Sequence, residues 1–182
     1  MNDVSRPGPN LPNLYALFPA APGELWPEFE FVHADEVPSP YRELLVHDQH
    51  MTVTVEAHHG DSVDVRILDR VHNDDVYARK ILLALHGSGR IVQFGIMKIN
   101  LSYCSPQVRE EIVAGQTPLG RILIEHDVLR RIEPTAFLRV IPGLAMMKWF
   151  ALDKPVRTYG RLAIIHCDEQ PAVELLEVVV PE

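Results

Sequence analysis

The sequence predicts an α+β fold, a single antiparallel β-sheet with helices packed on one face. Segments that alternate apolar and polar residues with the period of a strand outnumber the helix-like segments. A glycine-containing turn, HGSGR (86–90), connects two of these segments in the manner of a hairpin. Two other segments begin with a capping residue followed by proline, which is typical of helix starts.

The strands are expected in order along the chain. SVDVRILDRV (62–71) alternates, and so does VYARKILLAL (76–85). The turn then leads to IVQFGIMKIN (91–100), so the second and third strands should form an antiparallel hairpin. Two further strands are expected at 158–167 and 172–180.

Two helices are expected between the third and fourth strands. In the first, Ser105 suits the N-cap and Pro106 the first helical position, and Gly115 suits the stop. In the second, Thr117 is the expected cap and Pro118 the first helical residue.

The first forty residues differ from the rest because they contain eight of the fifteen prolines. We expect residues 1–40 to form a proline-rich extension that wraps the domain, with a short helix at 13–18. Apolar residues such as Leu14, Phe18 and Trp26 give this extension enough surface to pack. The domain itself should span residues 41–182.

Composition excludes several classes of protein. The chain of 182 residues fits one domain, with 47% hydrophobic and 23% charged residues. A net charge of −8 argues against nucleic acid or anionic membrane as a partner. No stretch is apolar enough to span a bilayer, and the N-terminus has no signal-peptide pattern, so we expect a cytoplasmic protein. A closed single domain is compatible with a monomer.

Arg79 occupies an unusual position in its strand. Alternation places it on the same face as the large apolar residues Tyr77, Ile81 and Leu83. A guanidinium in such a place needs an anionic partner, because desolvating an unpaired charge costs several kcal/mol or more.

Glu177 is likewise a charged residue on an apolar strand face, since alternation in the last strand places it on the same face as Leu175 and Val179. One interpretation is a buried Arg79–Glu177 ion pair, and another is a sheet face that is simply exposed. A third interpretation is that both residues bind a ligand.

The second helix start offers a donor for such a ligand. The N–H of Leu119 is among the unpaired donors of the opening turn, which favour an anion, and Gly120 leaves room for a close approach. Alternatively, Thr117 does no more than cap its own helix.

The sequence contains nine histidines, a residue type that often binds metal ions. His58–His59 and His126 with Asp127 have no third ligand at a suitable spacing, so exposed histidines are the better interpretation. Cys104 and Cys167 form neither a disulfide framework nor a zinc motif.

Four segments together resemble the chorismate lyases, or chorismate pyruvate-lyases, which form 4-hydroxybenzoate. They are LLVHDQHMT (44–52), YARKILL (77–83), TPLGRIL (117–123) and PAVELLEVVVP (171–181), in matching order and approximate spacing. The resemblance covers residues 41–182 and is closest to the actinobacterial and cyanobacterial branch. It implies a single antiparallel sheet, helices on one side and an enclosed ligand pocket beneath flaps. It also implies that MTVTVE (51–56), which alternates like a strand, begins a helix, and we adopt that expectation.

The resemblance also implies roles for individual residues. Arg79 matches the arginine that binds the ring carboxylate, and the backbone N–H groups of Met51 and Leu119 match those that complete that site. Glu177 matches the acid that meets the 4-hydroxyl. Some members have a second arginine on the strand after the one that carries Arg79, and here Lys98 is the nearest cation and the candidate partner of the enolpyruvyl carboxylate.

The expected activity is conversion of chorismate to 4-hydroxybenzoate and pyruvate, an elimination that aromatises the ring and needs no metal, nucleotide or redox cofactor. One alternative is a lyase for a related enolpyruvyl ether. The other is a non-catalytic sensor that binds an aromatic acid, since effector domains of some bacterial transcription regulators have a similar fold. Residues 1–40 are too short and proline-rich for a DNA-binding domain, so a sensor would require a separate partner.

Overall fold

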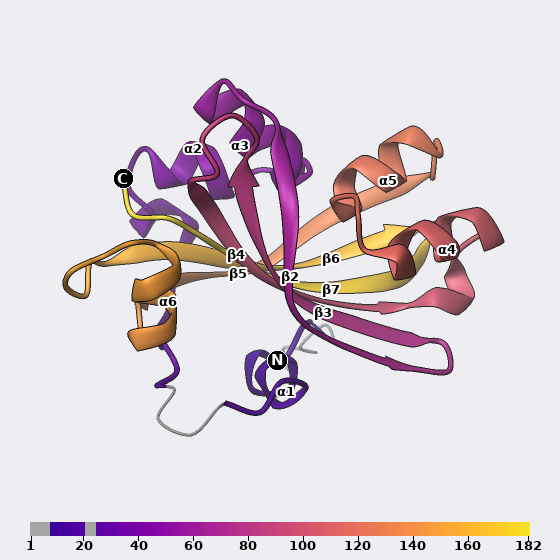
Figure 1. Cartoon of the computed structure of the whole chain (residues 1–182), viewed down its shortest axis with the longest axis horizontal. Coiled ribbons are helices and arrows are strands. Elements are labelled where there is room, and N and C mark those ends of the chain that lie inside the picture. The colour runs from indigo at the N-terminus through magenta and orange to yellow at the C-terminus, as the bar shows by residue number, and fades with distance from the viewer. Residues whose placement is uncertain (1–7, 21–24) are drawn as a thin grey trace, which may run out of the picture.

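A single antiparallel sheet organises the computed structural model, which describes residues 8–20 and 25–182 (Figure 1). Within these residues seven strands pair in the order β1-β5-β6-β7-β4-β3-β2, and each pairing is antiparallel. The expected α+β class is confirmed. The strands are β1 (Glu28–Val32), β2 (Val63–Asn73), β3 (Val76–Leu85), β4 (Ile91–Asn100), β5 (Arg130–Ile141), β6 (Thr158–Cys167) and β7 (Gln170–Val179).

Among the described residues, four α-helices cover one face of the sheet, and two short α-helices lie against the other (Figure 1). The first group is α2 (Tyr41–Leu45), α3 (Met51–His59), α4 (Pro106–Ala114) and α5 (Leu119–Glu125). The second is α1 (Leu11–Ala16) and α6 (Leu144–Trp149). None of the helices described is long and apolar enough to cross a membrane.

All five expected strands are present as β2, β3, β4, β6 and β7. The sequence did not indicate β5, which lies between β1 and β6 in the sheet. Its register with β6 shifts between Pro134 and Ala136, and proline cannot donate to the ladder. This irregularity breaks the alternation by which a strand is recognised.

The first expected helix is confirmed as α4. The Ser105 hydroxyl accepts from the Val108 N–H at 3.4 Å, and Gly115 ends the helix in the left-handed region with φ +71°. MTVTVE is helical in α3, as the chorismate lyase resemblance implied.

The expected start of α5 was wrong by one residue. Pro118 is the N-cap, with extended backbone (φ −57°, ψ 140°), and Leu119 is the first helical residue. Thr117 therefore precedes the cap, and no side chain caps this helix. The backbone carbonyl of Thr117 accepts a hydrogen bond from the Arg79 guanidinium.

The N-terminal segment contributes to the core on the side of α1 and α6. Asn10 caps α1 by accepting from the Asn13 N–H at 3.0 Å, and α1 overlaps the helix expected at 13–18. Leu14 and Phe18 belong to the same hydrophobic cluster as Phe94. Residues 1–7 and 21–24 of the predicted extension lie outside the described residues.

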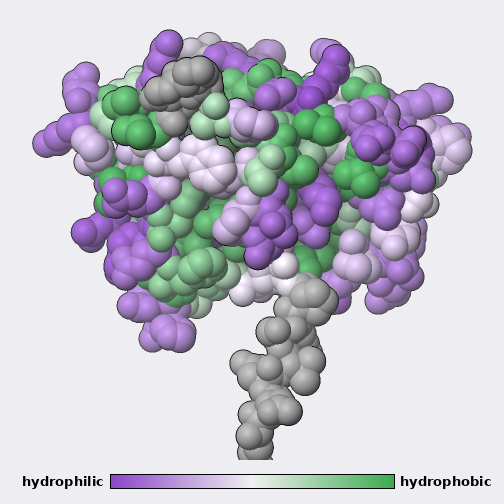
Figure 2. Space-filling model, turned by 90° about the horizontal axis from the view of Figure 1, so that it is seen from below, coloured by the Kyte–Doolittle hydropathy of each residue, from purple (hydrophilic) through white to green (hydrophobic). Residues whose placement is uncertain are grey.

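The surface on this side is mixed in character. Figure 2 views the molecule from below, towards α1 and α6, and shows hydrophobic residues in small groups between hydrophilic ones. Leu25, Phe31 and Leu144 are among the exposed hydrophobic residues. Scattered exposure of this kind is ordinary for a globular protein.

We expect Gly160→Ala to destabilise the protein by about 1–3 kcal/mol, the usual cost of overpacking. A Cβ atom at Gly160 in β6 would lie 2.6 Å from the backbone oxygen of Glu177, which the sheet holds in place. Gly87→Ala is the matched control, because its Cβ would meet only the side chain of Asp61 at 3.1 Å. Urea denaturation measures both changes, and equal stability of the two variants would contradict the packing described here.

Candidate ligand-binding site

An enclosed cavity lies between the sheet and the first turns of α3 and α5. The volume of this cavity that a water-sized molecule can occupy is about 50 Å³. One water requires roughly 10–15 Å³ by a comparable measure, so this cavity suits a small molecule. The residues that matter for its chemistry are Arg79, Gln93, Gly95, Arg161 and Glu177 from the sheet, with Met51 and Leu119 from the helices.

Arg79 is almost completely buried, with 1% of its surface exposed. Its Nη2 donates to the Thr117 carbonyl at 3.3 Å, while Nε and Nη1 have no hydrogen-bond partner among the described residues. Burial lowers the pKa of Arg79, and the neighbouring Tyr77 phenol partly offsets this effect. Arginine remains charged in proteins, so the cavity wall carries a positive charge with unmet donors.

Two backbone donors lie at the same cavity. Met51 and Leu119 are the first residues of α3 and α5, and the N–H groups of a first helical turn have no acceptor within their helix. Both residues line the cavity with Arg79. The structure therefore brings Arg79, Met51 and Leu119 together at one cavity.

Glu177 does not pair with Arg79. Its Oε2 accepts from Nε of Arg161 at 2.7 Å, in an ion pair whose side chains are 10% and 1% exposed. The sequence-based interpretation of an internal Arg79–Glu177 pair is therefore wrong, because Arg161 on β6 lies directly opposite Glu177 in the sheet.

Arg161 is satisfied by internal acceptors. Its Nη1 donates to the carbonyls of Leu45 (3.2 Å) and His47 (2.9 Å), and its Nη2 donates to that of Gln49 (3.1 Å). These carbonyls belong to the segment that leads into α3. Arg161 therefore fixes Glu177 and the approach to Met51 at the same time.

Gln93 and Gly95 lie on β4 between Arg79 and Glu177. Gly95 pairs with both Ile81 and Glu177, so the sheet has no side chain at this central position. Gln93 is 3% exposed, and its Oε1 has no partner among the described residues. The cavity thus has donors at the Arg79 end and acceptors at the Glu177 end.

The strand register gives the distance between the two ends. Arg79 is on β3 and Glu177 on β7, two strands away and offset by two residues. With roughly 4.8 Å between strands and 3.4 Å per residue, their Cα atoms are roughly 12 Å apart. After allowance for two side chains that extend into the cavity, this span suits one ring with substituents at opposite ends.

His50 forms a wall of the cavity beside α5. It is 7% exposed, and its Nε2 accepts from Nε of Arg130 at 2.7 Å. Burial, and secondarily the charges of Arg130 and Arg161, lower the pKa of His50 from 6.5 to about 4. Its imidazole is therefore neutral at pH 7. Gly120 allows this packing, since a Cβ there would lie 3.1 Å from the His50 ring.

A wider surface groove adjoins the cavity on the other side of His50. It has a volume of about 680 Å³ by the same measure and shares His50 and Ile132 with the cavity. Arg130 and Arg131 also line this groove. The groove and the cavity are therefore neighbours with His50 between them.

Four of the predicted site residues meet at the cavity, and one does not. Arg79, Glu177, Met51 and Leu119 line it together. Lys98 lies on the opposite face of the sheet, where it pairs with Glu174 at 3.6 Å, because its position on β4 alternates with those of Gln93, Gly95 and Met97.

Sequence reasoning missed Arg161. It shares a face of β6 with Tyr159, Ala163 and Ile165, so the argument that singled out Arg79 applies to it as well. Gln93 and His50 gave no comparable signal, because polar residues in an alternating strand or before a helix are ordinary.

Comparison with solved structures identifies proteins of similar fold. The structure of PhnF from Mycobacterium smegmatis matches with a TM-score of 0.54 at 13% identity, over 72% of this chain and 63% of PhnF. The effector domain of the same protein matches with a TM-score of 0.51 at 12% identity, over 72% of this chain and 88% of the domain. The ligand-binding domain of a putative GntR-family transcriptional regulator from Bordetella bronchiseptica matches with a TM-score of 0.50 at 12% identity, over 66% and 86%.

The chain has the fold of these regulator ligand-binding domains. It spans less than two thirds of full-length PhnF. No protein-family profile matches the sequence, and a search of curated proteins finds no relative. At such low identities the likeness concerns the fold alone, and the similar regulator domains give lyase activity no direct support.

We expect Arg161→Met to destabilise the protein by about 3–5 kcal/mol, because Glu177 would become a buried charge without a partner. Adding Glu177→Leu should recover part of this loss, since no unpaired charge then remains. Lys98→Met is the control, as its half-exposed pair with Glu174 should contribute less than about 1 kcal/mol. Urea denaturation provides the comparison. Equal stability of Arg161→Met and Lys98→Met would contradict the role of Arg161 in holding Glu177 and the segment that leads into α3.

Acid should destabilise the protein partly through His50. Below pH 6.5 the unfolded chain gains a proton that buried His50 resists until about pH 4, so stability falls as the pH falls through this range. The contribution reaches about 3 kcal/mol. Denaturation midpoints at pH 7 and pH 4.5 should therefore differ less in His50→Gln than in the wild type. An unchanged pH dependence would show that His50 is protonated normally in the folded state.

Proposed function

We propose that this protein binds a small monocyclic carboxylic acid that has a hydrogen-bond donor at the far end of the ring, with 4-hydroxybenzoate as the model ligand. The observation that carries the proposal is the guanidinium of Arg79, which is buried in an enclosed cavity with Nε and Nη1 unpaired. We further propose that binding serves a sensor function, as in an effector domain.

A carboxylate is the anion that fits the Arg79 end. An unpaired buried charge costs several kcal/mol, and a ligand carboxylate removes that cost through charge-assisted hydrogen bonds. The N–H groups of Met51 and Leu119 add donors for the second carboxylate oxygen. The small volume and apolar lining, which includes Ile81 and Leu175, favour one ring over an extended molecule.

The Glu177 end selects the opposite substituent. Arg161 holds one carboxylate oxygen of Glu177, and the unpaired Oε1 of Gln93 adds another acceptor nearby. A hydroxyl or amino group can donate to these acceptors, whereas a second carboxylate would be repelled. A ligand with no polar group at this end leaves the acceptors unmet, which costs affinity.

The similar solved structures support the sensor function as a proposal. Two of them are an effector domain and a ligand-binding domain of regulators. A sensor of this kind acts through a DNA-binding domain or partner, which the ligand would have to influence through the elements around the cavity, α3 and β7.

Chorismate lyase activity is the second candidate, favoured by the placement of the Glu177 carboxylate at the end opposite Arg79. In that reaction the C3–O bond of the enolpyruvyl ether and the C4–H bond break, the C4–H electron pair makes the ring aromatic, and the departing enolpyruvate takes up the proton and becomes pyruvate. Arg79 and the two backbone donors would hold the ring carboxylate, and Glu177 would accept the 4-hydroxyl proton in a hydrogen bond and orient C4. The enclosed cavity would exclude water from the developing charges.

Calorimetry with a ligand series tests the proposal. 4-Hydroxybenzoate and 4-aminobenzoate should bind, benzoate at least about tenfold more weakly, and terephthalate not measurably. Arg79→Met should weaken 4-hydroxybenzoate binding by about 100-fold or more, as expected for losing charge-assisted hydrogen bonds. Lys98→Met, on the opposite face of the sheet, should bind normally. Undiminished affinity in Arg79→Met would exclude Arg79 as the carboxylate partner.

Incubation with chorismate, without added metal or cofactor, separates the two candidates. Equal amounts of 4-hydroxybenzoate and pyruvate would establish the lyase. Tight binding of 4-hydroxybenzoate without turnover would support the sensor. Failure to bind any member of the acid series would refute both.

A further inference from the structure

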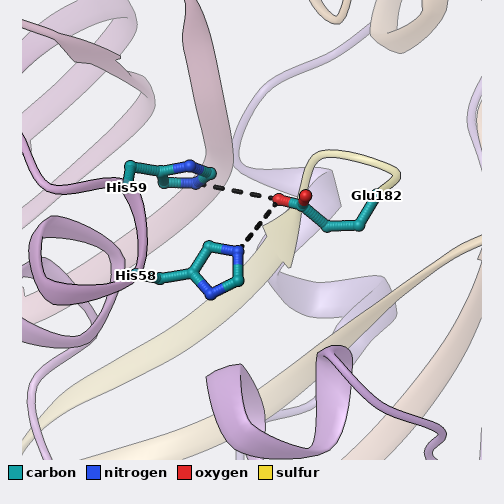
Figure 3. A group of neighbouring side chains, drawn as sticks. All are labelled: His58, His59 and Glu182. Carbon is teal, nitrogen blue, oxygen red and sulfur yellow. Dashed lines mark ion pairs between the residues drawn. The ribbon is translucent and has the colours of Figure 1, made fainter.

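A cluster of three potential metal ligands lies outside the cavity, at the C-terminal end of α3 (Figure 3). His58 and His59 close the helix, and Glu182 follows β7 in the sequence. Figure 3 shows both imidazole rings directed towards the same carboxylate oxygen of Glu182. We propose that His58, His59 and Glu182 bind a divalent transition-metal ion of the Zn²⁺ class.

The ligand atoms have the spacing of a metal site. Nε2 of His58 lies 3.4 Å and Nε2 of His59 lies 3.9 Å from Oε1 of Glu182, and the three ligand atoms are all within 4.8 Å of one another. Both distances exceed those of ordinary hydrogen bonds. Zinc bonds of about 2.0–2.2 Å in tetrahedral geometry separate neighbouring ligand atoms by roughly 3.3 Å. Only small side-chain movements would therefore bring the three atoms into coordination.

The fold anchors His59 and the backbone of Glu182, while the side chains of His58 and Glu182 are 29% and 26% exposed. The side chain of His59 is 6% exposed, and the backbone N–H of Glu182 donates to the Tyr41 hydroxyl at 2.9 Å. The Val180 N–H also donates to the Val92 carbonyl at 3.0 Å, which anchors the chain just after β7. An ordered carboxylate loses less entropy on binding a metal than one on a free chain.

The charges around the cluster favour a cation, with one exception. The C-terminal end of a helix attracts positive charge, and Glu182 supplies a negative one.

Arg90 is the exception, since its Nη2 lies 3.3 Å from Nδ1 of His59. Coordination through Nε2 places the remaining ring proton on Nδ1, where it would face the N–H of Arg90. Arg90 comes directly after the 86–89 turn, and its side chain would have to move on metal binding. Its removal should therefore strengthen metal binding, an effect that a simple ion-pair cluster does not predict.

Two imidazoles and one carboxylate suit Zn²⁺, with a water as the fourth ligand. The bound ion would connect the end of α3 to the segment after β7. Met51 at the start of α3 and Glu177 in β7 line the cavity, so the bound ion would stabilise the proposed ligand site by connecting the ends of the same two elements. The sequence analysis set His58–His59 aside for want of a third ligand, because Glu182 is remote from the two histidines in the chain.

Titration of the protein without an affinity tag, in competition with a chromogenic zinc chelator, tests the proposal. We expect one Zn²⁺ per chain with a dissociation constant on the order of micromolar. His59→Gln and Glu182→Gln should each weaken binding at least tenfold, and Arg90→Gln should strengthen it. His86→Ala is the matched control, because His86 also pairs with a carboxylate, Asp64 at 2.9 Å, but belongs to no group of three metal ligands among the described residues.

Cobalt provides an independent readout. Co²⁺ should give visible absorption bands of a four- or five-coordinate nitrogen–oxygen site in the wild type and in His86→Ala, and these bands should be absent in His58→Gln/His59→Gln. Equal zinc affinity in the wild type and this double variant would overturn the proposal. So would the absence of wild-type binding at 100-fold the expected dissociation constant, which would leave an ion-pair cluster only.

Discussion

The burial of Arg79 on a sheet face is the constraint around which the site is arranged. Alternation along β3 directs its side chain to the face of the sheet that the helices cover, where 1% of its surface is exposed. The neighbouring Gly95 adds no side chain, and the first turns of α3 and α5 close the space above it. The fold therefore buries the charge of Arg79 beside an enclosed cavity. This burial costs free energy unless an anion binds in the cavity.

Two buried arginines on the same face illustrate the difference between structural and binding roles. Arg161 donates to Glu177 and to three backbone carbonyls, and it joins β6 and β7 to the segment before α3. Arg79 donates to the Thr117 carbonyl and lies beside the Tyr77 phenol, while its Nε and Nη1 have no partner among the described residues. A buried structural cation is normally satisfied by the protein itself. The contrast supports a ligand as the missing partner of Arg79.

Much of the fold and part of the site follow from the sequence. Alternation located β3, β4 and β6, and the same alternation placed Arg79 and Glu177 on apolar faces. It could not indicate that Arg161 and not Arg79 pairs with Glu177, because strand order in a sheet depends on contacts remote in sequence. The expectation that Thr117 caps α5 was wrong, because Pro118 has extended backbone and is itself the N-cap residue. Lys98 was selected as the nearest cation in sequence, whereas the strand directs it to the opposite face.

A crystal structure with 4-hydroxybenzoate bound would show directly which groups of the protein the ligand contacts. We expect the ligand carboxylate within hydrogen-bond distance of Nε or Nη1 of Arg79, and its hydroxyl at the Glu177 carboxylate. Binding in the reverse orientation, or only in the groove outside His50, would contradict this expectation.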